Sequence, residues 1–223
     1  MMISILLVAH IAVLGYWLGS EFVINSTFRY VSWSEGLEFR ERNRLMDHVM
    51  IVDQHVRYAL ILQLGLGFAL AAMYGFIPGH TTTAWLALAV MVAWLAFVEL
   101  VHHKRHKPSG VALAKVDRVS RYFLLAFLLG YGAMGLLGMN TLPSWLALKL
   151  LCFGGVISCG IGIRFGLIHW FGVWQDIRDN GSNEVNEAAL KSAYTKATAV
   201  LLGLWAFIAA IVGLSVWKPL IGS

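Results

Sequence analysis

Residues 58–98 read YALILQLGLGFALAAMYGFIPGHTTTAWLALAVMVAWLAFV, and this stretch decides the fold. Its 41 residues include no Asp, Glu, Lys or Arg. A helix needs about 20 apolar residues to cross a hydrocarbon layer about 30 Å thick, so the stretch is long enough for two crossings. The Pro78-Gly79 pair has the chemistry of a turn and divides the stretch in two. The sequence therefore predicts two membrane helices joined by a short turn.

The composition of the whole chain agrees with this stretch. Of its 223 residues, 59% are hydrophobic and 13% are charged, which excludes a water-soluble globule. Only helices and closed barrels satisfy backbone polar groups in lipid, and long unbroken apolar runs favour helices. We therefore expect an all-α fold, a polytopic transmembrane helical bundle that forms a single domain over residues 1–223. The net charge of +5 comes from loops beside apolar spans, so we expect the lipid bilayer and not nucleic acid as the partner.

Six apolar segments are expected to cross the membrane. Loops rich in basic residues or in turn residues separate them. The expected spans are residues 3–24, 48–78, 83–102, 120–139, from 144 past 164, and 197–217.

The basic residues of the loops predict which way the bundle faces, because Lys and Arg accumulate on the cytoplasmic side. The loops after the second and fourth spans contain none. We therefore expect both termini to be periplasmic in the inner membrane of a bacterium. The basic loop residues are Arg29, Arg40, Arg42 and Arg44 after the first span, Lys104, Arg105, Lys107, Lys115 and Arg118 after the third, and Arg178 and Lys191 after the fifth.

A short motif occurs twice, each time where a helix is expected to rise from the cytoplasmic side. Val52-Asp53-x-x-x-Arg57-Tyr58 recurs 64 residues later as Val116-Asp117-x-x-x-Arg121-Tyr122. Residues four apart share one side of a helix, so each Asp is expected to pair with its Arg. Such a pair is an ordinary ion pair near a helix start, or it shapes a pocket for a quinone or a propionate.

His10 is the first candidate functional residue, because a histidine within an apolar span is costly and marks a functional site by default. At 1.5 Å per residue it lies about 10 to 12 Å from the outer end of its span. It either bonds to a neighbouring helix or acts as the axial ligand of a metal or haem, since neutral imidazole is the commonest metal ligand in proteins.

Lys149 is the second candidate, about one turn inside the fifth span and near the expected level of His10. Its side chain either extends outward to the headgroups or points inward. If it points inward, it can pair with a carboxylate such as a haem propionate, or act as a weak ligand.

Three further histidines are expected near the cytoplasmic side. His55 lies on the second span, and His102 and His103 end the third. One of the latter two is a candidate to face His55 across an inner-leaflet haem, while solvated histidines of a basic loop are the plainer interpretation. Copper is a weaker cofactor hypothesis, because the methionines show no Met-x-x-x-Met cluster and Cys152 and Cys159 lie seven residues apart. The sequence contains no Gly-rich phosphate loop, nucleophile elbow or zinc-protease motif.

Three stretches resemble a known bacterial membrane superfamily. The first span, with His10-x6-Trp17-x-Gly19, is similar to the opening helix of the copper-resistance D-type proteins and the HemJ-type, oxygen-independent protoporphyrinogen oxidases. The stretch from Arg44-Leu45-Met46 through the second span resembles the next helix of those oxidases, and Trp145-Leu146-x-x-Lys149-Leu150 resembles their lysine-bearing helix. The resemblance implies haem b as cofactor and essential roles for the histidine and the lysine. The oxidases have four helices, whereas here two expected spans separate those bearing His10 and Lys149.

The function expected from the residues and the resemblance is that of a membrane protein that binds haem b and transfers electrons. It is either a subunit of an oxidoreductase that exchanges electrons with partner subunits or with quinone, or an enzyme like the protoporphyrinogen oxidases. The alternatives are a copper-handling transporter and a structural subunit without a cofactor. The candidate residues are His10 as metal ligand, Lys149 as catalytic and cofactor-binding residue, and His55, His102 and His103 as cofactor-binding residues.

Overall fold

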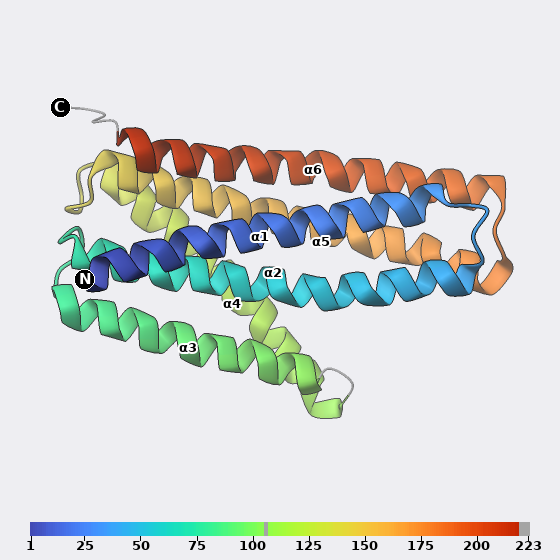
Figure 1. Ribbon diagram of the computed structural model, residues 1–223, viewed down its shortest axis with the longest axis horizontal. Helices are drawn as coiled ribbons and strands as arrows, with labels where there is room; N and C mark the ends of the chain where they lie inside the picture. Colours follow the sequence, from blue (N-terminus) through green and yellow to red (C-terminus); the bar gives the residue numbers. More distant parts are fainter. Residues whose placement is uncertain (105–106, 219–223) are drawn as a thin grey trace.

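The computed structural model describes residues 1–104 and 107–218, and in this part of the chain every regular element is a helix. All six helices are long and apolar enough to cross a membrane, as predicted. They run back and forth along one axis (Figure 1). In chain order they are α1 (Met2–Trp33), α2 (Phe39–Met73), α3 (His80–Lys104), α4 (Pro108–Leu136), α5 (Ser144–Asn180) and α6 (Glu184–Trp217).

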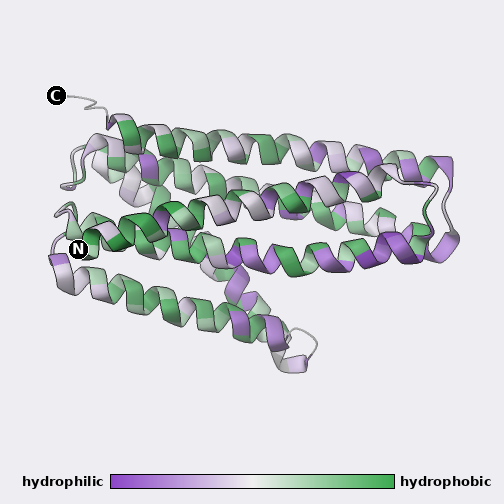
Figure 2. Cartoon of the chain, in the orientation of Figure 1, coloured by the Kyte–Doolittle hydropathy of each residue, from purple (hydrophilic) through white to green (hydrophobic). Residues whose placement is uncertain are grey.

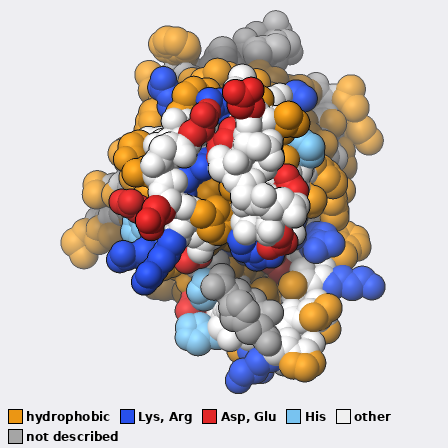
Figure 3. Space-filling view, turned by 90° about the vertical axis from the view of Figure 1, so that its right-hand side faces the viewer, with side chains coloured by type: hydrophobic (Ala, Val, Ile, Leu, Met, Phe, Trp, Pro, Cys, Tyr) orange, Lys and Arg blue, Asp and Glu red, His pale blue; other side chains and the backbone are white. Residues whose placement is uncertain are grey.

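Four helices extend well beyond the thickness of a hydrocarbon layer. Helices α1, α2, α5 and α6 have 32, 35, 37 and 34 residues, which at about 1.5 Å per residue makes each of them roughly 50 Å long. The start of α1 and the end of α6 lie at the same end of the bundle (Figure 1). The long helices project at the opposite end, where hydrophilic residues gather (Figure 2) and where basic and acidic side chains cover the surface (Figure 3). We call this the polar end.

At the polar end the helices are longer than the expected membrane spans. The second span was expected from residue 48, but α2 begins at Phe39, and the sixth was expected from residue 197, but α6 begins at Glu184. Hydropathy detects where a helix leaves lipid, whereas a helix ends where its terminal backbone groups find other partners. At α6 this partner is Asn183, whose side-chain oxygen accepts from the backbone N–H groups of Val185 and Asn186, each at 3.0 Å.

The four long helices form the central bundle, and α3 and α4 flank it. Helix α3 packs mainly on α2 and α4 mainly on α5, while the contact between α3 and α4 is small. Trp17 of α1 is buried at the centre of the bundle, with its ring edge-on to Phe153 of α5 at 6.2 Å between centroids. The helices that carry His10 and Lys149 therefore belong to one bundle, although two helices separate them in the sequence.

The two repeated motifs both form the ion pairs that their spacing predicts. Arg57 Nε lies 3.2 Å from Asp53 Oδ2, and Arg121 donates from Nη2 to Asp117 Oδ2. Each pair lies on one side of its own helix, in α2 and in α4. The prediction of paired charges is confirmed.

A buried ion pair joins α2 to α6 at the polar end. Arg42 Nη1 and Nη2 donate to the two carboxylate oxygens of Glu187 at 2.7 and 2.9 Å, and both residues are almost fully buried. Arg42 Nε also donates to the carbonyl oxygen of Val31 at 3.1 Å, and Ser182 donates to the Glu187 carboxylate at 2.7 Å. The guanidinium lies 5.2 Å from the centre of the Trp174 ring. The pair therefore connects all four long helices and leaves little of its hydrogen-bonding capacity unused.

Replacing Arg42 with Met is expected to destabilise the polar end strongly, because it leaves the Glu187 carboxylate buried without its cation. Loss of one partner of a buried pair costs about 3–5 kcal/mol, whereas an apolar pair of similar volume is often neutral. The unfolding temperature of the protein in detergent should fall for Arg42→Met and recover in Arg42→Met combined with Glu187→Leu. Arg178→Met, which breaks an exposed pair with Asp179, is the control. Equal stability of Arg42→Met and this control would contradict the assignment.

Six crossings place the α1–α2 loop and the α4–α5 turn on opposite sides of the membrane. Gly36 in the first and Thr141 in the second are both exposed. With Cys152 and Cys159 replaced by Ala, a membrane-impermeant thiol reagent should label Gly36→Cys and Thr141→Cys from opposite faces of sealed vesicles. Labelling of both from the same face would contradict the six-span arrangement.

Candidate functional site

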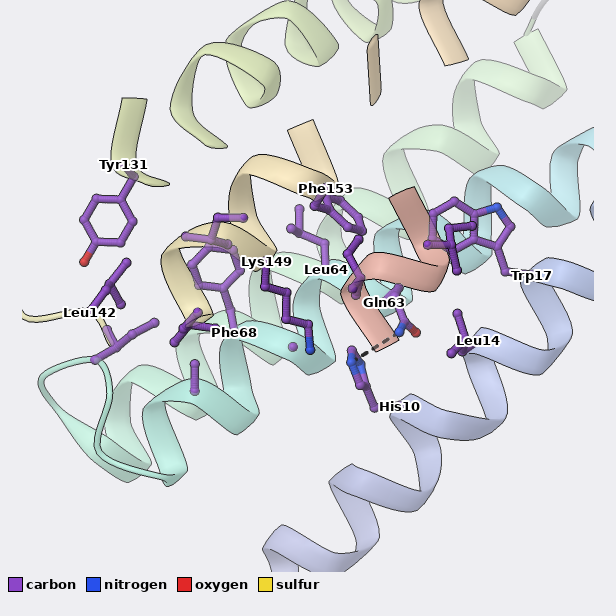
Figure 4. A pocket seen from close by; sticks show the side chains of 17 residues that line it. His10, Leu14, Trp17, Gln63, Leu64, Phe68, Tyr131, Leu142, Lys149 and Phe153 are labelled. Carbon is purple, nitrogen blue, oxygen red and sulfur yellow. Dashed lines mark hydrogen bonds between the residues drawn. The ribbon is translucent and has the colours of Figure 1, made fainter. Parts of the chain in front are cut away.

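A small cavity lies within the bundle in the half near the termini (Figure 4). It encloses about 80 Å³. Its lining is apolar apart from a histidine, a glutamine, a lysine and the polar tips of two aromatic residues. The lining residues are His10, Leu14 and Trp17 of α1; Gln63, Leu64, Gly67, Phe68 and Ala71 of α2; Tyr131 of α4; Leu146, Lys149, Leu150 and Phe153 of α5; Ile208 and Ile211 of α6; and Ile77 and Leu142 of the loops.

His10 projects from α1 into this cavity with one nitrogen unused. Its Nε2 lies 3.2 Å from Gln63 Nε2 of α2, and the dashed line in Figure 4 marks this contact. Its Nδ1 is buried and has no partner among the described residues, and the same is true of Gln63 Oε1. If the Gln63 amide donates to Nε2, Nδ1 carries the proton; with the amide reversed, Nε2 donates and Nδ1 keeps a free lone pair. Only the second arrangement leaves Nδ1 able to ligate a metal, because a protonated nitrogen has no free lone pair.

The backbone of α2 gives the His10 ring its space. A Cβ atom built on Gly67 would lie 3.4 Å from His10 Cε1, which is van der Waals contact, so the ring lies directly against this glycine. Gln63 and Gly67 are four residues apart on one side of α2, so one holds the ring by a hydrogen bond and the other makes room for it. The ring orientation is therefore set by α2 and not by α1 alone.

Lys149 points into the cavity and not outward to the headgroups. Its side chain extends from α5 toward His10 (Figure 4). It forms no hydrogen bond or ion pair with any residue that the structure describes. The residue is half-buried, and an ammonium withdrawn from water is unfavourable unless it is paired, so this geometry suits an anionic or electron-rich partner. Of the two orientations that the sequence allowed, the structure has the inward one.

The depths of the site residues agree with the expectation that they share one level. His10 lies about 12 Å along α1 from its start, Lys149 about 8 Å along α5, and Gln63 about 15 Å from the end of α2. Gln63 is the residue that sequence reasoning missed. It is the one Gln in the charge-free stretch 58–98 and is buried in the structure, so a polar residue in an apolar run was the available signal.

His55 belongs to a second polar cluster, which contains two tyrosines and an acid. The Tyr16 hydroxyl of α1 bonds to His55 Nδ1, and the Tyr58 hydroxyl donates to Glu99 of α3. The His55 ring stands edge-on between the two tyrosine rings, at 5.9 and 6.1 Å between centroids. His103 Nδ1 lies 3.0 Å from the other oxygen of Glu99. We call Tyr16, His55, Tyr58, Glu99 and His103 the tyrosine–histidine cluster.

The structure joins His55 and His103 through this cluster, without bringing them to one metal. His102 stacks edge-on to His103 at 6.2 Å between centroids. Nδ1 of His55 is engaged by Tyr16 and Nδ1 of His103 by Glu99. Among the described residues there is no group of three or more His, Cys, Asp and Glu that could hold a metal ion. Haem binding by His55, His102 and His103 stays a prediction.

The cavity and the tyrosine–histidine cluster follow one another along the same two helices. Tyr16 is six residues after His10 on α1, and His55 is eight residues before Gln63 on α2. The two sites are therefore about 9 to 12 Å apart along the helix axes, with the cluster nearer the polar end. One rigid pair of helices thus positions both sets of polar groups.

Comparisons with protein-family models, with curated proteins and with solved structures find no match to the chain.

Proposed function

We propose that this protein binds one haem b in the cavity of His10 and Lys149 and transfers electrons within the membrane. The observation that carries the proposal is the buried, unpartnered Nδ1 of His10 beside the half-buried ammonium of Lys149, which pairs with no described residue; both groups face an apolar cavity. Buried polar groups normally have partners, so two such groups in one cavity call for a ligand that supplies them. A haem supplies both, because its iron takes an imidazole ligand and its propionates take a cation.

The roles of the individual residues follow from their positions. His10 would ligate the iron, Gln63 would hold the tautomer and orientation of the imidazole ring, and Lys149 would pair with a propionate. The haem would carry single electrons by cycling between ferric and ferrous iron. A volume of about 80 Å³ is below the roughly 300 Å³ of ordinary ligand pockets, so the macrocycle would lie partly between the helices and in contact with lipid.

The arrangement of the helices supports the resemblance to the four-helix protoporphyrinogen oxidases. Helices α3 and α4 lie outside the central bundle, so α1, α2, α5 and α6 correspond to a four-helix core with two flanking additions. If the protein is a protoporphyrinogen oxidase, Lys149 would lie beside the reacting porphyrin. The alternative functions are copper handling and a structural role without a cofactor. The absorption spectrum and the metal content of the purified protein distinguish them from haem binding.

Two substitutions in the cavity test the haem site. His10→Ala should abolish or strongly reduce haem content while the protein still inserts, and His169→Ala, an exposed histidine of α5, should retain it. Lys149→Gln should keep the haem and lower its midpoint potential, because a nearby cation destabilises the ferric state. Haem content is measured by the reduced-minus-oxidised spectrum. Full haem content in His10→Ala would overturn the ligand assignment, and an unchanged potential in Lys149→Gln would remove Lys149 from the haem environment.

We further propose that the tyrosine–histidine cluster binds the headgroup of a quinone, the electron partner in the membrane. His55 Nε2 has no partner among the described residues, and His55 is exposed about 27 Å from the outer end of α2, near the expected edge of the hydrocarbon layer. Polar groups that face lipid suit a lipid-soluble molecule with a head that donates and accepts hydrogen bonds. By the distribution of Lys and Arg, we place this cluster and the polar end on the cytoplasmic side of a bacterial inner membrane.

Photolabelling with an azido-quinone in nanodiscs tests the second site. His55→Ala and Tyr16→Phe should each lose most of the labelling, because the first removes the hydrogen bond to the headgroup and the second removes the bond that orients the His55 ring. His48→Ala, which changes an exposed histidine two turns away on α2, should label like the parent protein. Parent-like labelling of both cluster variants would exclude the site. Quinone labelling that persists in His10→Ala would show that the second site does not depend on haem binding at the first.

A further inference from the structure

A groove of about 490 Å³ lies between α1 and α6, apart from both sites described above. The direct contact between these two helices is small, which leaves the groove open between them. Its walls are mainly aromatic, with hydroxyl, amide and guanidinium groups toward one end. The lining residues are Phe22, Asn25, Ser26, Arg29 and Trp33 of α1 and Tyr194, Thr198 and Trp205 of α6.

The groove is apolar at membrane depth and polar toward the polar end. Phe22 and Trp205 form its deeper part, with ring centroids 4.6 Å apart. Trp205 lies about 18 Å along α6 from Trp217, well inside a hydrocarbon layer of about 30 Å. Arg29 lies about 40 Å along α1 from its start, at the level of the headgroups. The groove therefore runs along the membrane normal from hydrocarbon to headgroup, as a bound lipid does.

The polar part of the groove is built from fixed groups with spare hydrogen-bonding capacity. Asn25 Oδ1 accepts from the hydroxyls of Tyr194 and Thr198, each at 3.2 Å, so its amide N–H groups remain available. Trp33 stands edge-on to Tyr194 at 5.1 Å between centroids. These contacts hold α1 and α6 in place around the opening.

Arg29 gives this part of the groove an uncompensated positive charge. It forms no ion pair or hydrogen bond with the described residues, and the Glu35 carboxylate further along the chain is engaged by Lys191. A guanidinium presents a planar set of donors that matches phosphate oxygens. The charge, the amide of Asn25 and the aromatic walls thus fit an anionic headgroup with an acyl chain attached.

We propose that the groove between α1 and α6 binds one anionic phospholipid from the leaflet at the polar end. Its phosphate contacts Arg29 and Asn25, and an acyl chain packs along Phe22 and Trp205. The lipid fills the space that the two helices leave open and adds to the side-chain contacts between them. The site is independent of haem and quinone binding, because it shares no residue with either of those sites.

Native mass spectrometry of delipidated protein tests the proposal with phosphatidylglycerol, phosphatidylcholine and inorganic phosphate as probes. One phosphatidylglycerol should bind in preference to phosphatidylcholine, and inorganic phosphate should neither bind nor displace it. Arg29→Gln should weaken phosphatidylglycerol binding about fivefold, the effect of one basic residue near a membrane surface. Arg29→Lys should retain most of the binding.

Arg40→Gln is the matched control, because Arg40 is an exposed arginine at the same end, on α2, and does not line the groove. Its phosphatidylglycerol binding should equal that of the parent protein. Equal losses in Arg29→Gln and Arg40→Gln would indicate general attraction to a basic surface and overturn the site. Displacement by inorganic phosphate would indicate a soluble anion and overturn the lipid. Gel-filtration elution at the parent position shows that each variant is folded.

Discussion

The absence of water from the hydrocarbon layer is the constraint on which the rest of this structure depends. Backbone N–H and C=O groups that find no partner there cost several kcal/mol each, so each spanning segment must satisfy its own groups as a helix. The same constraint applies to side chains. His10, Gln63 and Lys149 are expensive at this depth when they are alone, and the structure places them around one cavity. The lack of water thus explains both the helical secondary structure and the grouping of the polar side chains around one cavity.

Different forces hold the two ends of the bundle. In lipid, apolar faces gain little by leaving one hydrocarbon environment for another, and close packing of small residues replaces the hydrophobic effect. A Cβ on Gly132 of α4 would lie 3.0 Å from the carbonyl oxygen of Ala147 on α5, which shows how closely these helices approach. Beyond the membrane, burial from water becomes effective again. There, Trp170 and Trp174 stack at 5.1 Å, and the Arg42–Glu187 pair is enclosed by the projecting helices.

The polar sites lie at different positions along the central helices. Helix α1 contributes His10 to the cavity, Tyr16 to the tyrosine–histidine cluster and Arg29 to the groove beside α6, in order along its axis. Helix α2 contributes Gln63 and His55 at matching levels. Helix α1 therefore takes part in all three sites, at successive depths, with α2 as its partner in the first two and α6 in the third.

The sequence by itself determined the all-helical fold, the six spans and the two ion pairs of the repeated motif, because these depend on runs and spacings within single helices. It also indicated His10 and Lys149, since a polar residue in an apolar run is visible without a partner. Only the tertiary structure decided that α1 and α5 share a bundle while α3 and α4 flank it, and that Gln63 completes the site. The ion pair between Arg42 and Glu187, which are 145 residues apart, could not be predicted from the sequence either. Such contacts depend on which helix faces meet, and periodicity within one helix does not encode its neighbours.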